Sequence, residues 1–173
     1  GSKIMSIMSL NQITKALCNA PTIIVDCSEY KELINVQYEI PYHRPDIIKI
    51  QPNEQDDDVE RKYIMNHSEH SLEYLIEDRN SRRAVFPITY VNGMGKCICL
   101  VHLFIRDQKL HINEYFRSQN FQRNFEYDCE TACMVMENCL NILNKHELFE
   151  YDQIEPGTIT VFCANLHIKL KRN

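Results

Sequence analysis

The chain has 173 residues, of which 44% are hydrophobic, enough to bury one core and too few for two domains. Its net charge of -5 excludes a general nucleic-acid surface, because neutralising phosphates requires lysine and arginine in excess. No apolar run reaches membrane-spanning length, and the N-terminus lacks the order of a secretion signal. We therefore expect a single cytoplasmic domain over residues 1–173 that contacts no membrane, in which Gly1 and Ser2 are a cloning remnant.

The eight cysteines favour reduced thiols over a disulfide framework, because no C-x-x-C pair occurs and most lie inside apolar segments. Cys97 and Cys99 share one side of a predicted strand, and His67 and His70 share one side of a predicted helix start. Neither pair has the complement that a tetrahedral metal site requires, so we expect no metal.

The N-terminal part predicts a helix over residues 9–18 with Ser9 as its N-cap. Two segments rich in Ile, Val and Tyr, residues 20–27 and 34–42, predict strands. Residues 51–62 are polar and acidic and contain a proline, which predicts a long exposed loop.

The middle of the chain predicts a helix over residues 68–78 and then a strand over 84–91, which Pro87 places at a sheet edge or a bulge. Residues 97–105 are almost continuously apolar, as expected of a strand covered on both faces. A turn near 107–109 returns the chain as a second strand, so antiparallel pairing should bring Cys97 beside residues 117–119.

The C-terminal part predicts a long helix that opens on Asp128, because its apolar residues recur at helical spacing and a helix N-terminus favours negative charge. Residues 155–160 predict a turn, and 158–170 predict a last strand. Alternation along that strand places four residues on one face: Cys163, Asn165, His167 and Lys169.

The order of these features resembles the thymidylate synthase superfamily. The chain carries "NSRR" at 80–83, a cysteine on a strand, "RS" at 117–118 and "LHI" at 166–168 after a "PG". The family pattern is D-P-x-S-R-R, P-C-H, Q-R-S-x-D, G-x-P-F-N and H-x-Y. Alignment through Arg117 and Ser118 puts Cys97 on the nucleophile and Asp128 on the last asparagine without a gap. The resemblance implies an α+β fold in which a long buried helix packs on a mixed sheet. It also implies that two subunits dimerise through their sheets.

The resemblance also implies a role for each matched residue. Cys97 is the thiolate that adds to C6 of a pyrimidine, with its pKa lowered by a nearby guanidinium. His167 contacts the sugar hydroxyl. The phosphate of a nucleoside monophosphate is held by Arg117 and Ser118 of one subunit and by two arginines of the partner in a homodimer, Arg82 and Arg83.

Asp128 carries the substrate prediction, because it stands where uracil-specific members place an asparagine. A carboxylate only accepts hydrogen bonds, so it suits the exocyclic amine of cytosine. The implied reaction is therefore transfer of a one-carbon unit from methylenetetrahydrofolate to C5 of CMP or dCMP.

Several positions depart from the family pattern. Lys96 and Ile98 flank the cysteine in place of proline and histidine, Lys169 replaces the terminal tyrosine, and Asn120 replaces the aspartate that engages folate. The segment H-E-L-x-W, which supplies a catalytic glutamate, is not found. Two classes therefore stay open: a cytidylate C5 hydroxymethyltransferase, and a noncatalytic domain that binds a pyrimidine nucleotide or serves for dimerisation.

Overall fold

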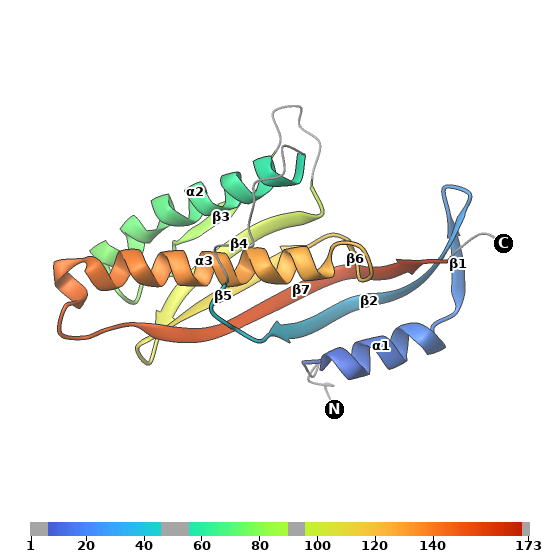
Figure 1. The fold of residues 1–173 in the computed structure, drawn as a ribbon, viewed down its shortest axis with the longest axis horizontal. Helices are drawn as coiled ribbons and strands as arrows, with labels where there is room; N and C mark the ends of the chain where they lie inside the picture. The colour runs from blue at the N-terminus through green and yellow to red at the C-terminus, as the bar shows by residue number, and fades with distance from the viewer. Residues whose placement is uncertain (1–6, 46–55, 90–95, 171–173) are drawn as a thin grey trace.

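The computed structural model describes residues 7–45, 56–89 and 96–170, with the side chains of α2 described from residue 59. These residues form a seven-stranded mixed sheet packed against helices, which confirms the α+β class (Figure 1). The strand order is β1-β2-β7-β5-β4-β3, and β6 pairs with β7. The elements are α1 (Leu10–Asn19), β1 (Thr22–Val25), β2 (Ser28–Ile40), α2 (Asp56–Glu77), β3 (Val85–Pro87), β4 (Ile98–Arg106), β5 (Lys109–Phe116), β6 (Gln119–Asn120), α3 (Phe125–Lys145), a 3-10 turn (Glu147–Phe149) and β7 (Glu155–Lys169).

The first helix and the two strands that follow it agree with the sequence prediction, and the structure shows that the strands form a hairpin. Ser9 Oγ accepts a hydrogen bond from the backbone N–H of Gln12, and Gln12 Oε1 accepts one from the N–H of Ser9, forming a capping box. Strands β1 and β2 confirm the predicted strands, although β2 begins earlier, at Ser28. Their turn places Asp26 and Cys27 at φ of 49° and 63°, the left-handed backbone that a two-residue hairpin requires.

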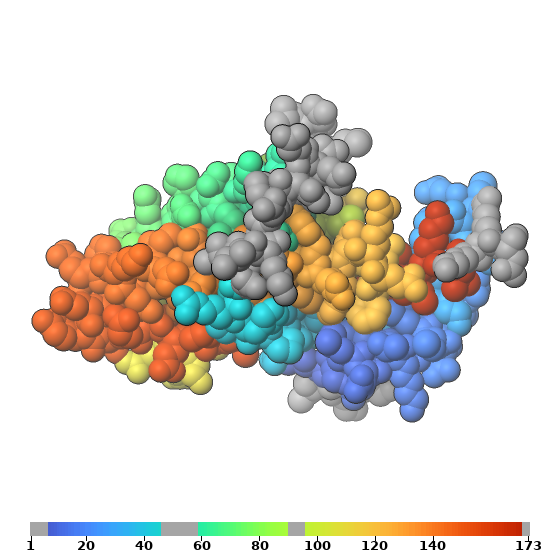
Figure 2. Space-filling model, viewed as in Figure 1, coloured from blue at the N-terminus to red at the C-terminus, as the bar shows by residue number. Residues whose placement is uncertain are grey.

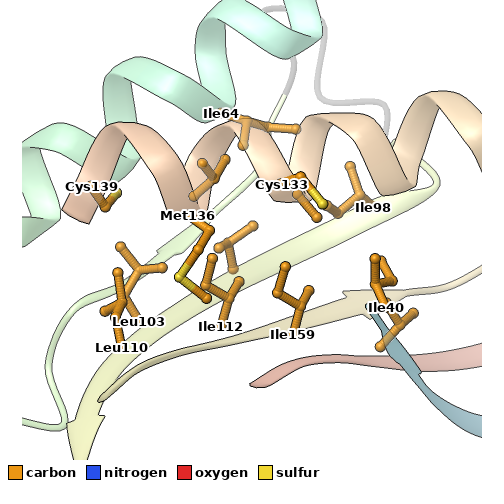
Figure 3. Close-up of a cluster of buried hydrophobic side chains, with 14 of the residues drawn as sticks. Ile40, Ile64, Ile98, Leu103, Leu110, Ile112, Cys133, Met136, Cys139 and Ile159 are labelled. Carbon is orange, nitrogen blue, oxygen red and sulfur yellow. The ribbon is translucent and has the colours of Figure 1, made fainter. Parts of the chain in front are cut away.

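Two layers enclose the core. Helices α2 and α3 lie side by side on one face of the sheet, and together with α1 they form much of that surface (Figures 1 and 2). Met136 of α3 points toward Ile112 of the sheet, and Ile64 of α2 belongs to the same buried cluster (Figure 3). None of the described helices is long and apolar enough to cross a membrane.

The exposed loop predicted over residues 51–62 is wrong from Asp56 onward, where α2 begins; residues 51–55 lie outside the described part. Arg61 explains why this polar segment is helical and packed. Its Nε donates to Thr131 Oγ1 over 2.9 Å, and its guanidinium lies 4.0 Å from the ring centroid of Tyr127. Arg61 therefore connects the N-terminal part of α2 to the first turns of α3.

The second face of the sheet is less covered than the apolar run 97–105 predicted. Along β4, buried residues alternate with half-buried ones, so only the helical face is fully packed. Four aromatic side chains form two stacked cross-strand pairs on this second face, which we call the open sheet face: Phe104 with His111, and Tyr115 with Phe162.

The turn predicted over residues 155–160 is also wrong, because β7 already begins at Glu155 and runs parallel to β5. The glycine in this segment serves close approach of the two strands. A Cβ atom on Gly157 would lie 2.6 Å from the carbonyl oxygen of Leu110 and 2.7 Å from Nδ1 of His111. The proline stands near the start of the strand, where a missing N–H is tolerated.

Gly157→Ala should lower the free energy of unfolding by about 1–3 kcal/mol, because the added methyl group forces β5 and β7 apart. Urea denaturation of this variant and of Ala164→Ser, at an exposed position of the same strand, measures the effect. A gain of about 0.4–1 kcal/mol, usual for Gly→Ala where the backbone accommodates it, would contradict the close approach.

Candidate functional site

The candidate site forms where the pairing of β5 with β7 is interrupted. Phe116 pairs with Cys163, the chain leaves the sheet at Arg117 and Ser118, and pairing resumes between Gln119 and Leu166 in the same register. The predicted hairpin is confirmed, with a two-residue turn at Asp107 and Gln108. Arg117 and Ser118 therefore do not pair with β7, and their side chains lie at a fixed place beside this strand.

The hairpin brings Cys97 to Arg117, as its predicted register requires. The backbone N–H of Arg117 donates to the carbonyl of Cys97 over 2.8 Å, and Arg117 Nε donates to the carbonyl of Lys96 over 2.9 Å. The guanidinium is therefore anchored next to the thiol-bearing residue.

A cavity of about 380 Å³ lies at this interruption, and Arg117, Ser118 and His167 all line it. Its other lining residues come from β1, β2 and β7: Val25, Tyr30, Glu32 and Asn165. His167 Nδ1 lies 3.0 Å from Asn165 Oδ1 and 3.4 Å from Ser118 Oγ. Burial lowers the pKa of His167, so its imidazole is neutral at pH 7. Three of the predicted site residues thus share one cavity.

Asp128 lies in the first turn of α3 and does not open it, which corrects the predicted helix start. The helix begins at Phe125, and Asn124 is its N-cap. Gln119 Nε2 donates to Asp128 Oδ2 over 2.8 Å, and the hydroxyl of Tyr38 donates to Gln119 Oε1. Asp128 is therefore tied through Gln119 to the same segment that carries Arg117 and Ser118.

The prediction of a lowered pKa for Cys97 is wrong. The thiol is half-buried against the core, and burial raises its pKa, an effect that Arg117 opposes. The carboxylates of Glu60 and Asp128 raise it further. The desolvation of the sulfur outweighs the guanidinium, so the resting group is a thiol.

The carboxyl groups of Glu60, Glu114 and Asp128 lie close enough to influence one another, and that of Glu114 is buried. Glu114 is 2% exposed, and its Oε1 has no hydrogen-bond partner in the described part of the chain. Burial raises the pKa of Glu114 to about 8, and the negative charges of Asp128 and Glu60 add to the shift. Glu60 lies 3.2 Å from the ammonium group of Lys96. Glu114 is therefore largely protonated at pH 7.

Arg82 and Arg83 do not reach this cavity within one chain. Both are exposed and line a separate polar pocket with Tyr74, Glu77 and Ser81. The residues considered for metals make local contacts instead. His67 stacks on Tyr63, His70 Nδ1 lies 2.8 Å from the carbonyl of Asn66, and none of the eight cysteines forms a disulfide bond. In the described ranges, no group of three metal-binding side chains occurs.

Sequence reasoning missed Gln119, Glu114 and Glu60. The alternation of Leu110, Ile112 and Phe116 on the buried face of β5 includes position 114, so Glu114 was detectable as a charge in the core. Glu60 was not recognised as a site residue because the acidic segment around it predicted an exposed loop. Nothing in the sequence distinguishes Gln119, whose role depends on Tyr38 and Asp128.

Compared with protein-family models and with curated protein sequences, the chain matches none. The assignment of a function therefore depends on the geometry of the site and on the motif resemblance.

Glu114→Gln should raise the free energy of unfolding at pH 7 by about 1–3 kcal/mol. In the unfolded chain the carboxyl loses its proton near pH 4.5, and in the folded chain near pH 8. Between these values the folded state holds more protons, so wild-type stability falls as pH rises and levels off above about 8.

Thermal or urea unfolding from pH 4 to 9 measures this effect as the difference between the variant and the wild type. The difference should be smallest at the acid end, grow across the window and then stay constant. Glu39→Gln, at an exposed position of β2, is the control and should show no such trend. A constant difference at all pH values would contradict a buried, protonated Glu114.

Proposed function

We propose that this chain is a thymidylate synthase-like domain that binds a pyrimidine nucleoside monophosphate, with CMP or dCMP as the preferred ligand. The main support for this proposal is that Arg117, Ser118 and His167 line one cavity, while Gln119, which follows Ser118 in the chain, contacts Asp128. Neither Asp128 nor Cys97 is among the residues that line this cavity in the described part of the chain, and Asp128 is connected to it through Gln119. The cavity volume is within the range of about 300–1,000 Å³ that is usual for small-molecule sites.

The charge of the cavity supports a homodimer. Among its described lining residues, Arg117 is the cation and Glu32 is an anion, while His167 is neutral. A phosphate dianion needs more positive charge than this. We assign the missing cations to Arg82 and Arg83 of the partner subunit, since these residues are exposed and do not contact the cavity of their own chain.

The open sheet face supplies a surface for that dimer. Tyr115 is 36% exposed and stacks on Phe162 with ring centroids 4.9 Å apart, and both lie on strands next to the cavity. Aromatic side chains in this setting are typical of protein interfaces. Pairing of two such faces would bury them and bring the cavity of one subunit near the edge of the other.

The residues do not fit the folate cofactor that the family uses. Asn120 stands at the position of the folate-contacting aspartate, and its Oδ1 accepts hydrogen bonds from the backbone N–H groups of Gln122 and Arg123 at 3.0 and 2.9 Å. The side chain thus stabilises its own turn. The proposal therefore extends to nucleotide binding and not to one-carbon transfer.

Wild-type protein should bind CMP or dCMP in calorimetric titration, and Arg117→Ala should weaken binding at least about tenfold, because a charged hydrogen bond to phosphate is lost. Arg123→Ala, at an exposed arginine in the next turn, is the matched control and should bind as wild type. Failure of the wild type to bind any of CMP, dCMP, UMP and dUMP would refute the proposed function.

The dimer is tested by mixing subunits. The double variant Arg82→Ala and Arg83→Ala should not bind alone, but mixing it with Arg117→Ala should restore about a quarter of the sites, because each mixed dimer contains one complete site. No recovery after verified subunit exchange would place both arginines outside the site.

Addition of the Cys97 thiol to the pyrimidine is a second candidate function, favoured by the position of Cys97 beside Arg117, whose charge favours the thiolate. The thiol loses its proton to solvent, the sulfur bonds to C6, and the electron pair of the C5=C6 bond takes a proton from water at C5. Reversal releases the original C5 hydrogen and expels the thiolate. Hydrogen exchange at C5 therefore needs no co-substrate.

Tritium at C5 of CMP, dCMP or dUMP should be released to water by the wild type and not by Cys97→Ala. Because burial raises the pKa of Cys97, release should increase as pH rises through neutrality, in step with the thiolate fraction. Cys99→Ala, two residues away and also half-buried, is the control and should retain release. Equal release by Cys97→Ala would exclude the sulfur as nucleophile, and absence of release from the wild type would leave binding as the sole function.

A further inference from the structure

A buried chain of hydrogen bonds joins three separate elements behind the candidate site. Tyr38 of β2 donates through its hydroxyl to Gln119 Oε1 of β6, and Gln119 Nε2 donates to Asp128 Oδ2 of α3 over 2.8 Å. Tyr38 and Gln119 are 0% and 1% exposed. Because water does not reach these two groups, each depends on the next for its hydrogen bond.

The direction of this chain is fixed by its last member, because the carboxylate of Asp128 only accepts hydrogen bonds. The amide of Gln119 must therefore present its NH2 group to Asp128, since the reverse orientation would set the amide oxygen against a carboxylate oxygen. Its own oxygen then faces Tyr38, whose pKa is raised by burial, so that the phenol keeps its proton and donates to that oxygen. One oxygen of Asp128 is therefore held as a hydrogen-bond acceptor in a defined orientation.

We propose that Gln119, oriented by Tyr38, is a positioning residue that holds Asp128 as an acceptor and thereby sets the preference of the site for a pyrimidine base carrying an amino group. This inference rests on the proposed function and adds the device that determines base choice. A fixed acceptor matches the exocyclic amine of cytosine and repels the carbonyl oxygen that uracil presents at the same place.

Packing alone does not account for Gln119. A buried amide costs stability unless both of its ends are satisfied, and an apolar side chain of similar volume avoids that cost. In the described part of the chain, its side chain bonds to Tyr38 and Asp128. The amide of Gln119 thus serves to orient the carboxylate of Asp128.

The experiment compares the dissociation constants of CMP and UMP for the wild type, Gln119→Met and Tyr38→Phe by calorimetry. The preference for CMP should fall about tenfold in Gln119→Met, mainly through weaker CMP binding, and in the same direction in Tyr38→Phe. Tyr38→Phe keeps the ring volume, so it tests the chain of bonds if the glutamine variant does not fold. Gln122→Met, at an exposed glutamine of the next turn, is the control and should keep the wild-type preference.

The same comparison in an Asp128→Asn background separates positioning from general damage. If Gln119 acts through Asp128, Gln119→Met should change the CMP to UMP ratio less than about twofold once the carboxylate is gone. An unchanged ratio in folded Gln119→Met, or an equal fall in both backgrounds, overturns the inference while nucleotide binding stands. A wild type that binds neither nucleotide overturns the proposed function and the inference together.

Discussion

The sheet and the candidate site both depend on the register of one strand, β7. It pairs antiparallel with β2 on one side and parallel with β5 and then β6 on the other. His167 and Asn165 belong to this strand, and Arg117 and Ser118 lie at the gap in its parallel ladder. Because side chains alternate between faces, a shift of one residue in β7 would turn the site residues away from the cavity.

The polar groups beneath α3 oppose the stability that this framework provides. Glu114 Oε1 has no hydrogen-bond partner among the described residues, the thiol of Cys97 is half-buried, and Gln119 is an amide inside the core. Apolar replacements at such positions would make a simpler core. All three groups lie near Asp128, while the rest of the helical layer is packed by aliphatic side chains (Figure 3). Such a gathering of polar groups is typical of a site where stability is exchanged for function.

Local patterns allowed prediction of the elements whose causes are local. The turn near 107–109 between two strand-like segments predicted the hairpin, and with it the approach of Cys97 to Arg117. The start of α2 was missed because Arg61 is stabilised by α3, and the start of β7 because Gly157 serves contact with a neighbouring strand. Gln119 and Glu114 acquire their properties only from residues of other elements, which no single segment reveals.

The pairing of β2 with β7 also determines when the cavity is completed. Tyr30 pairs with Lys169, so the two strands come from opposite ends of the described chain, whereas β1 with β2 and β4 with β5 close as local hairpins. Contacts between distant segments form late, since the loop between them must close first. Glu32 and Tyr30 meet His167 only at that stage. Occupancy of the cavity would thus report on a fully assembled sheet, because β2 and β7 supply separate walls of it.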